Sequence, residues 1–236
     1  MPYRVSLTTK VKGGGSGLLA IEPEDYSTAE VNALKNAGYT VLAYLSVGSV
    51  SDERSYYKAL QPHTLRRLDD WEHERYLDVC SKAVQGWAIN QGKKILAIGF
   101  DGLWIDNLDV YEEYPSEAAF DGITRILTAL YPHGYIMVNG GIKYVSEAIA
   151  KRLHIIHGVT QEEVFSRITD YDGKGTFGKQ DAKQSAEYQK YIANALGAGI
   201  EAYLLEYTRD EKLKQKIITY CEASGAGYYI SEDVDL

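Results

Sequence analysis

The stretch GFDGLWIDNLDVY, residues 99–111, joins an apolar, strand-like run to three aspartates, Asp101, Asp106 and Asp109. Parallel barrels carry their functional groups at the carboxyl ends of the strands, so the segment GLWID is predicted to bring Asp106 to the mouth of such a barrel. Asp101 precedes the strand, next to glycines, and is interpreted as a turn or cap residue at the opposite face. For Asp109 two positions stay open, one directly behind the site and one in solvent.

Seven further short runs rich in β-branched and aromatic residues accompany GLWID. They are YRVSL (3–7), GLLAIEP (17–23), TVLAYLSVG (40–48), YIMVN (135–139), HIIHGV (154–159), EAYLLEY (201–207) and GYYIS (227–231). Their near-continuous apolar character is typical of parallel strands buried on both faces. Helical patterns lie between most of them, for example residues 116–132, where apolar side chains recur every three to four positions before Pro132.

Repetition of strand and helix over the whole length predicts an α/β fold, a (β/α)8 TIM barrel, with a long doubly wound sheet as the alternative. No linker interrupts residues 1–236, which are therefore expected to form a single catalytic barrel domain. One crossover departs from the pattern. The segment TTKVKGGGSG (8–17) is too short and too rich in glycine for a helix, so the first crossover helix is expected to be missing or shortened.

The composition excludes several classes of function. The net charge of −8 argues against a nucleic-acid partner, which selects a basic face. No apolar stretch approaches the roughly 18 residues that span a membrane, and no signal peptide follows the first residues, so an export signal is expected to be absent or already removed. The two cysteines and five histidines lack the spacing of metal ligands, and neither a metal nor a cofactor is expected. The segment GKGTFGKQ (173–180) has the glycine and lysine spacing of a phosphate loop but no Ser or Thr after the lysine.

Five motifs in this order resemble the glycoside hydrolase family 114 group, the endo-α-1,4-polygalactosaminidase-like barrels. They are AYLSVGSVSDERSYY (43–57), GFDGLWIDNLDVY (99–111), VNGG (138–141), GVTQEEVF (158–165) and LLEYT (204–208). The resemblance implies a (β/α)8 barrel that cleaves α-1,4-linked galactosamine-containing polysaccharide with Asp106 after the fourth strand and Glu162 after the sixth. It also implies an extracellular or cell-surface location. Glu22 and Glu206 stand where that family often has Asp.

Glycosidic cleavage needs two carboxyl groups, one to protonate the leaving oxygen and one to attack the anomeric carbon or activate water. A carboxyl at a partly dry barrel mouth beside another carboxylate has its pKa raised, as a general acid requires. We therefore expect Asp106 to act as nucleophile and Glu162 as acid/base in a retaining mechanism, and the reverse assignment stays open. Glu162 is preferred to its neighbour Glu163. Substrate contacts are expected from side chains at or near predicted strand ends: Glu22, Tyr44, Ser46, Asp109, Asn139, Glu206 and Tyr207.

The acidic groups expected at the mouth predict the charge of the substrate. Convergence of several carboxylates without a lysine in the same motifs favours a cationic amino sugar polymer or oligosaccharide. Two alternatives remain: a non-catalytic carbohydrate-binding TIM barrel, and a glycosidase of different specificity. The segment FDGLWIDNLD superficially echoes the chitinase motif DGxDxDxE, but Leu108 occupies the position of the acid glutamate and Trp104 that of the first inner aspartate.

Overall fold

The computed structural model describes residues 2–68 and 71–236, and its centre is one sheet of eight parallel strands. The strands are hydrogen-bonded in the order β1 (Tyr3–Ser6), β2 (Gly17–Ile21), β3 (Tyr39–Ser46), β7 (Gly102–Asp106), β8 (Tyr135–Asn139), β9 (Gly158–Glu162), β12 (Glu201–Tyr207) and β13 (Gly227–Ser231). A parallel bridge between Pro2 and Tyr228 links the two ends of the sheet. The sheet is thus a nearly closed barrel, and the predicted TIM barrel is confirmed.

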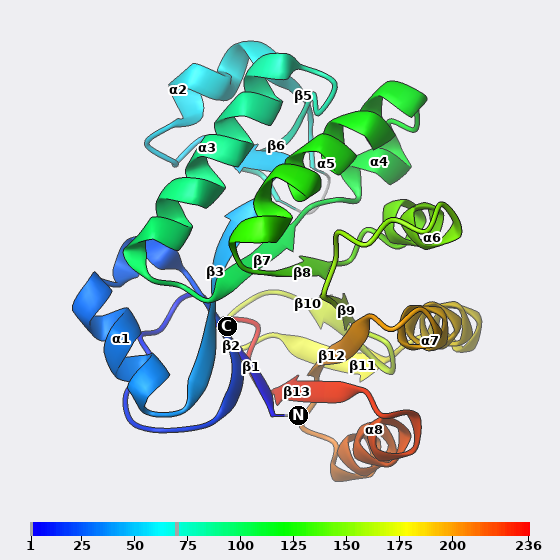
Figure 1. The fold of residues 1–236 in the computed structure, drawn as a ribbon. Coiled ribbons are helices and arrows are strands. Elements are labelled where there is room, and N and C mark those ends of the chain that lie inside the picture. The colour runs from blue at the N-terminus through cyan, green and yellow to red at the C-terminus, as the bar shows by residue number, and fades with distance from the viewer. Residues whose placement is uncertain (1, 69–70) are drawn as a thin grey trace.

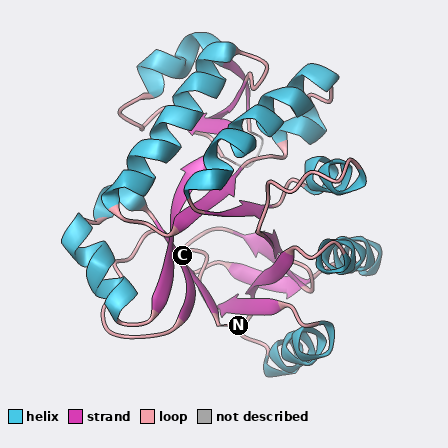
Figure 2. Ribbon diagram, in the orientation of Figure 1, coloured by secondary structure: helices cyan, strands magenta, loops and turns pink. Residues whose placement is uncertain are grey.

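Helices surround the barrel (Figures 1 and 2). The longer ones are α1 (Thr28–Asn36), α3 (Lys82–Ile98), α5 (Glu117–Leu130), α6 (Ile142–Ala150), α7 (Ala182–Gly197) and α8 (Glu211–Ser224). The short ones are η1 (Pro23–Asp25), α2 (Tyr57–Leu60), η2 (Gln61–His63), α4 (Val110–Glu113) and η3 (Tyr131–His133). Residues 7–16, all described, contain no helix between β1 and β2, as the glycine-rich sequence predicts. Among the described residues no helix is both long and apolar enough to cross a membrane.

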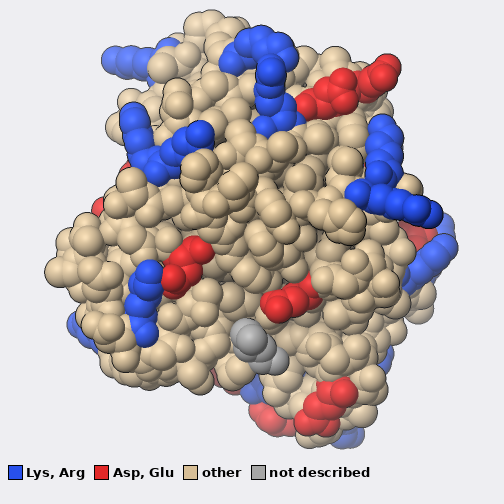
Figure 3. Space-filling model, viewed as in Figure 1, with Lys and Arg blue, Asp and Glu red and all other residues tan. Residues whose placement is uncertain are grey.

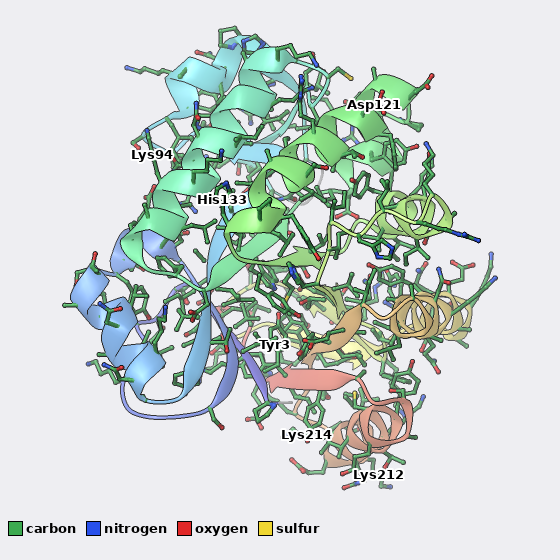
Figure 4. All side chains as sticks on the ribbon, in the orientation of Figure 1. Tyr3, Lys94, Asp121, His133, Lys212 and Lys214 are labelled. Atoms are coloured by element: carbon green, nitrogen blue, oxygen red, sulfur yellow. The ribbon has the colours of Figure 1, made fainter. Side chains whose placement is uncertain are left out.

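Alternation along each strand creates two cores. Trp104 and Met137 point into the barrel, where the Trp104 indole donates to the Tyr3 hydroxyl at 2.9 Å. Figure 4 places Tyr3 at the ring of strands and Lys94, Asp121 and Lys212 on the surrounding helices. Their sequence neighbours Leu103 and Ile105 point outward and pack in the larger core under the helices. This alternation decides which residues near each strand end face the barrel mouth.

Two excursions from the barrel follow the carboxyl ends of β3 and β9, so both lie on the mouth side. After β3 the chain builds an antiparallel sheet from β4 (Ser49–Ser51), β5 (Thr64–Arg67) and β6 (Glu74–Leu77). After β9 it forms a hairpin of β10 (Ser166–Asp170) and β11 (Thr176–Lys179). The sequence analysis did not predict either one.

The sixth barrel strand was misplaced by the sequence analysis. HIIHGV (154–159) was predicted, but β9 is Gly158–Glu162. Ile155 and Ile156 are apolar because they pack in the outer core from the loop before the strand, so their hydrophobicity does not mark strand pairing.

The face drawn in Figure 3 carries most of its Lys and Arg side chains towards its edge, and its middle carries few charges.

Candidate active site

The two candidate carboxylates lie at the carboxyl ends of two barrel strands that are separated by a single strand. Asp106 is the last residue of β7 and Glu162 is the last residue of β9, with β8 between them. The residue after each one has a left-handed backbone, with φ of 64° at Asn107 and 56° at Glu163. Asn adopts this conformation readily, whereas Glu does so uncommonly. The backbone therefore turns sharply directly after each of the two carboxylates.

Asn139, at the end of β8, joins the two carboxylates. Its Nδ2 donates to Asp106 Oδ1 at 3.0 Å and to Glu162 Oε1 at 2.7 Å. Both oxygens are bonded to the same nitrogen, so these two oxygens lie less than about 6 Å apart. The position of one amide thus defines the spacing of the pair.

Each carboxylate also accepts a hydrogen bond from a tyrosine on an adjacent strand. Tyr44 donates to Asp106 Oδ2 at 3.2 Å, and Tyr207 donates to Glu162 Oε2 at 2.6 Å. Asp106 accepts a further bond from the backbone N–H of Asn107, at 2.9 Å. The structure therefore brings together Tyr44, Asp106, Asn139, Glu162 and Tyr207, five of the residues that the sequence analysis selected.

Burial changes the proton affinity of both carboxyls. Removal from water raises the pKa of Asp106 to about 7, and the nearby Glu162 charge adds to the effect. Burial also raises the pKa of Glu162, while the bonds from Tyr207 and Asn139 act in the opposite direction. Two close carboxyls that both resist ionisation titrate as a pair. The site is thus suited to hold one proton and one negative charge near neutral pH.

Asp109 is half-buried at the turn that follows Asn139, between the two positions expected for it. Its Oδ1 accepts from the backbone N–H of Gly141 at 2.9 Å, and burial raises its pKa to about 6. Gly140 and Gly141 both have positive φ, and a Cβ on Gly140 would come within 3.0 Å of the Asp109 carboxylate. Asp109 thereby stabilises the turn that follows Asn139.

Ser46 and Glu22 lie on the side of Asp106. Ser46 accepts a hydrogen bond from Asn107 Nδ2 at 3.0 Å and supports the left-handed turn there. Glu22 is paired with Arg54 at 2.6 Å. The sequence analysis assigned no role to Arg54 or Glu74, although Glu74 accepts a bond from Ser49 and its charge contributes to the raised pKa of Asp106. Both belong to the excursion after β3, whose loops the sequence places near the mouth, and Arg54, expected at the surface, is instead about three-quarters buried in its pair with Glu22.

The expected substrate contact of Glu206 needs correction. Glu206 precedes Tyr207 on β12 and therefore points to the opposite side of the sheet, where it is fully buried. Its carboxylate accepts from the backbone N–H groups of Phe165 and Ser166, at 2.9 and 2.8 Å, and from the Ser166 hydroxyl. Glu206 thus holds the segment that follows Glu162 and is closed to a substrate.

A pocket of 600 Å³ opens beside Asn139 and Glu162, between the ends of β8 and β9 and the starts of α6 and α7. Its charged lining residues are Asp109, Glu112, Lys143, Glu162, Glu163 and Glu187. Among the described residues, the buried oxygens Asn139 Oδ1 and Gln161 Oε1 have no hydrogen-bond partner, and both residues line this pocket. The charged side chains that line the pocket are thus mainly acidic. No cluster of His, Cys, Asp and Glu with metal-binding geometry occurs within residues 2–68 and 71–236.

Comparisons with known proteins identify the family and the fold of this chain. The family model described as Glycoside-hydrolase family GH114 matches residues 8–235. The glycoside hydrolase domain of PelA from Pseudomonas aeruginosa has the same fold, with a TM-score of 0.81, 14% identity, and coverage of 99% of this chain and 98% of that one.

Ega3 from Aspergillus fumigatus, solved in complex with galactosamine, gives a TM-score of 0.77 and 16% identity, covering 98% of this chain and 90% of that one. An uncharacterized protein of Deinococcus radiodurans is 32% identical over 107 residues, which are 41% of this chain and 34% of that protein. The chain thus spans about a third of the length of this relative.

Proposed function

Because the chain belongs to glycoside hydrolase family GH114, and is thus a glycoside hydrolase, we propose that it cleaves α-1,4-linked galactosamine-containing polysaccharide with retention of configuration. Asp106 is the nucleophile and Glu162 the acid/base in this proposal. Residues 1–236 are taken as one catalytic domain, since the strands of one barrel extend from Tyr3 to Ser231. As the polymer substrate is too large to enter a cell readily, an extracellular or cell-surface location is part of the proposal.

The hydrogen bonds from Asn139 to both carboxylates support the proposed retaining mechanism. Retaining glycosidases hold their two carboxyl groups about 5 to 5.5 Å apart, closer than inverting ones, and one Asn139 nitrogen that binds both Asp106 and Glu162 supports the shorter spacing. Asp106 attacks the anomeric carbon, while Glu162 gives its proton to the leaving glycosidic oxygen. In the second step Glu162 takes a proton from water, and the resulting hydroxide displaces Asp106 from the sugar.

The hydrogen bonds support this distribution of roles. Asp106 accepts three, one of them from a backbone N–H that can act only as a donor, whereas Glu162 accepts two from side chains. Donors stabilise the ionised form of a carboxyl. In this proposal the pair shares one proton, and the three donors keep the charge on Asp106 when the proton resides on Glu162, against the burial and the Glu162 charge that raise the pKa of Asp106 to about 7.

The substrate charge follows from the lining of the pocket. Five carboxylates and one lysine line it, which attracts a cationic, partly de-N-acetylated amino sugar polymer. The galactosamine bound to Ega3 supports the same class of sugar. A chitinase-like mechanism is not supported, because Leu108, at the position of its acid, is fully buried in the outer core.

Two substitutions test the proposal against a non-catalytic sugar-binding barrel. Asp106→Asn and Glu162→Gln keep the side-chain shape, and each should reduce turnover of α-1,4-galactosamine oligomers at least about a hundredfold. With a substrate that carries an activated leaving group, azide should restore turnover to Glu162→Gln and give a glycosyl azide of retained configuration. Asp106→Asn should form no covalent intermediate.

The matched control is Asp101→Asn, which removes an aspartate at the other end of the same strand, where Asp101 pairs with Lys35 at 2.7 Å. It should keep its turnover. Near-normal hydrolysis by either site variant would remove that residue from catalysis, and azide rescue of Asp106→Asn alone would favour the reversed roles or an inverting route.

A further inference from the structure

Two aromatic side chains from distant loops meet on the mouth side of the barrel. Among the described residues, Trp71 and Tyr171 are the large apolar side chains that are exposed, at 55% and 50%. Trp71 lies in the loop between β5 and β6, and Tyr171 in the turn between β10 and β11. Their ring centroids are 5.7 Å apart in an edge-to-face arrangement. Such a contact leaves ring surface open to solvent.

The loop of Trp71 is tied to the Asp106 side of the active site. The Trp71 carbonyl accepts from the backbone N–H of Glu74 at 3.0 Å. The Glu74 carboxylate accepts from Ser49, whose hydroxyl is hydrogen-bonded to that of Ser46 at 3.0 Å. Ser46 in turn accepts from Asn107, the neighbour of Asp106. This continuous chain of contacts places the β4–β5–β6 sheet beside the nucleophile.

The loop of Tyr171 is tied to the Glu162 side. Phe177 of the β10–β11 hairpin contacts Tyr207, with ring centroids 6.2 Å apart, and the Tyr207 hydroxyl is bonded to Glu162. Ile168 on the other strand of the hairpin also packs against the core inside the barrel. The backbone N–H of Ile168 donates to the side chain of Glu163. Trp71 and Tyr171 therefore connect the two sides of the active site at its outer rim.

We propose that Trp71 and Tyr171 together form a rim subsite that binds one pyranose ring of the polymer, at a distance from the bond that is cleaved. This inference rests on the proposed function. The C–H face of a pyranose packs against an aromatic ring, and the indole N–H and phenol O–H can bond to sugar hydroxyls or amines. Two side chains offer far less area than the roughly 1,000 Å² that a specific protein partner requires, but enough for a single sugar.

A rim subsite acts only on substrates long enough to reach it. Trp71→Ala and Tyr171→Ala should each raise KM roughly tenfold for long galactosamine oligomers, the size expected for one lost aromatic contact, with little change in kcat. The effect should shrink as the oligomer is shortened. Trp71→Phe keeps a ring and should recover most of the affinity. A KM change of the same size on every oligomer would assign the two residues a structural role and overturn the inference.

Tryptophan fluorescence provides a direct measurement of binding. Of the three tryptophans, Trp104 is buried and Trp87 is half-buried against Tyr56, so acrylamide quenching reports mainly on Trp71. The test uses the inactive variant that combines Asp106→Asn and Glu162→Gln, titrated with long oligomers. We expect the oligomers to protect Trp71 from quenching, and expect the protection to disappear when Trp71→Phe is added.

The outcomes separate this inference from the proposed function. Oligomers that are cleaved by the native chain and bind the inactive variant by calorimetry, yet leave Trp71 fully open to acrylamide, would overturn the rim subsite and leave the proposed function intact. If the native chain neither cleaves nor binds these oligomers, the proposed function is wrong and the inference is wrong with it.

Discussion

Replacement of Asp106 by Asn should stabilise the protein at alkaline pH, although it removes the proposed nucleophile. Burial and the Glu162 charge raise the pKa of Asp106 from its ordinary 3.8 to about 7. The folded chain therefore keeps one proton on the Asp106–Glu162 pair between about pH 4 and pH 7, where the unfolded chain has already lost it. Since the folded state binds more protons in this interval, the contribution of Asp106 to the free energy of unfolding falls as the pH rises.

The magnitude follows from the size of the pKa shift. A rise of the Asp106 pKa from 3.8 to about 7 corresponds to an upper limit of about 4 kcal/mol. Solvent at the barrel mouth screens part of this, and Asn cannot accept the Tyr44 bond in the same way. We expect the free energy of unfolding of Asp106→Asn, measured relative to that of the native chain, to rise by about 2 kcal/mol as the pH increases from 4 to 8.

Urea unfolding at pH 4, 5, 6, 7 and 8 measures this difference. Glu30→Gln is the control of opposite sign, because Lys10 and the cap residue Ser27 lower the pKa of Glu30 to about 2. The stabilising effect of Glu30 is complete above the ordinary pKa and is lost only as the pH falls towards 2, so this variant should show a constant deficit from pH 5 to pH 8. A difference for Asp106→Asn that stays flat, or that falls with rising pH, would refute the claim that the native site destabilises the ionised carboxylate.

Three further changes have definite expected outcomes. Glu206→Ala leaves the buried N–H groups of Phe165 and Ser166 without acceptors and should lower the free energy of unfolding by about 3 kcal/mol in urea; a loss below about 1 kcal/mol would contradict the assigned role. Tyr207→Phe removes a donor that lowers the pKa of Glu162, so the alkaline limb of the pH–rate profile should move to higher pH, and a downward move would count against Glu162 as the acid. Raising NaCl from 50 to 500 mM should increase KM for a cationic oligomer but not for a neutral glycoside, and equal values would disprove attraction by the acidic pocket.

The barrel could be predicted from the sequence because its strands are buried on both faces. GLWID, YIMVN, EAYLLEY and GYYIS match β7, β8, β12 and β13 residue for residue. Prediction failed where apolar residues serve another purpose, as in the buried loop residues Ile155 and Ile156 before β9. The β4–β5–β6 sheet and the β10–β11 hairpin were missed since their short, half-exposed strands are stabilised by contacts with distant parts of the chain.

The candidate site was predictable to the extent that strand ends define it. Asp106, Asn139 and Glu162 each end a strand and face one another, as position alone predicts. Glu206 also lies near a strand end, but the alternation of side chains turns it away, and a one-residue difference in register cannot be judged from composition. The Asn139 bridge and the pairing of Glu22 with Arg54 depend on side-chain geometry, which no sequence motif encodes.

The configuration of the first product tests the central claim most directly. Proton NMR of an α-1,4-galactosamine oligomer, recorded within the first minutes of hydrolysis, distinguishes the α-anomer from the β-anomer before mutarotation. A closely spaced carboxyl pair that shares the Asn139 donor, acting by retention, predicts that the α-anomer appears first and the β-anomer only later. Initial release of the β-anomer, or the absence of any cleavage, would contradict Asp106 and Glu162 as the nucleophile and acid/base of a retaining glycoside hydrolase.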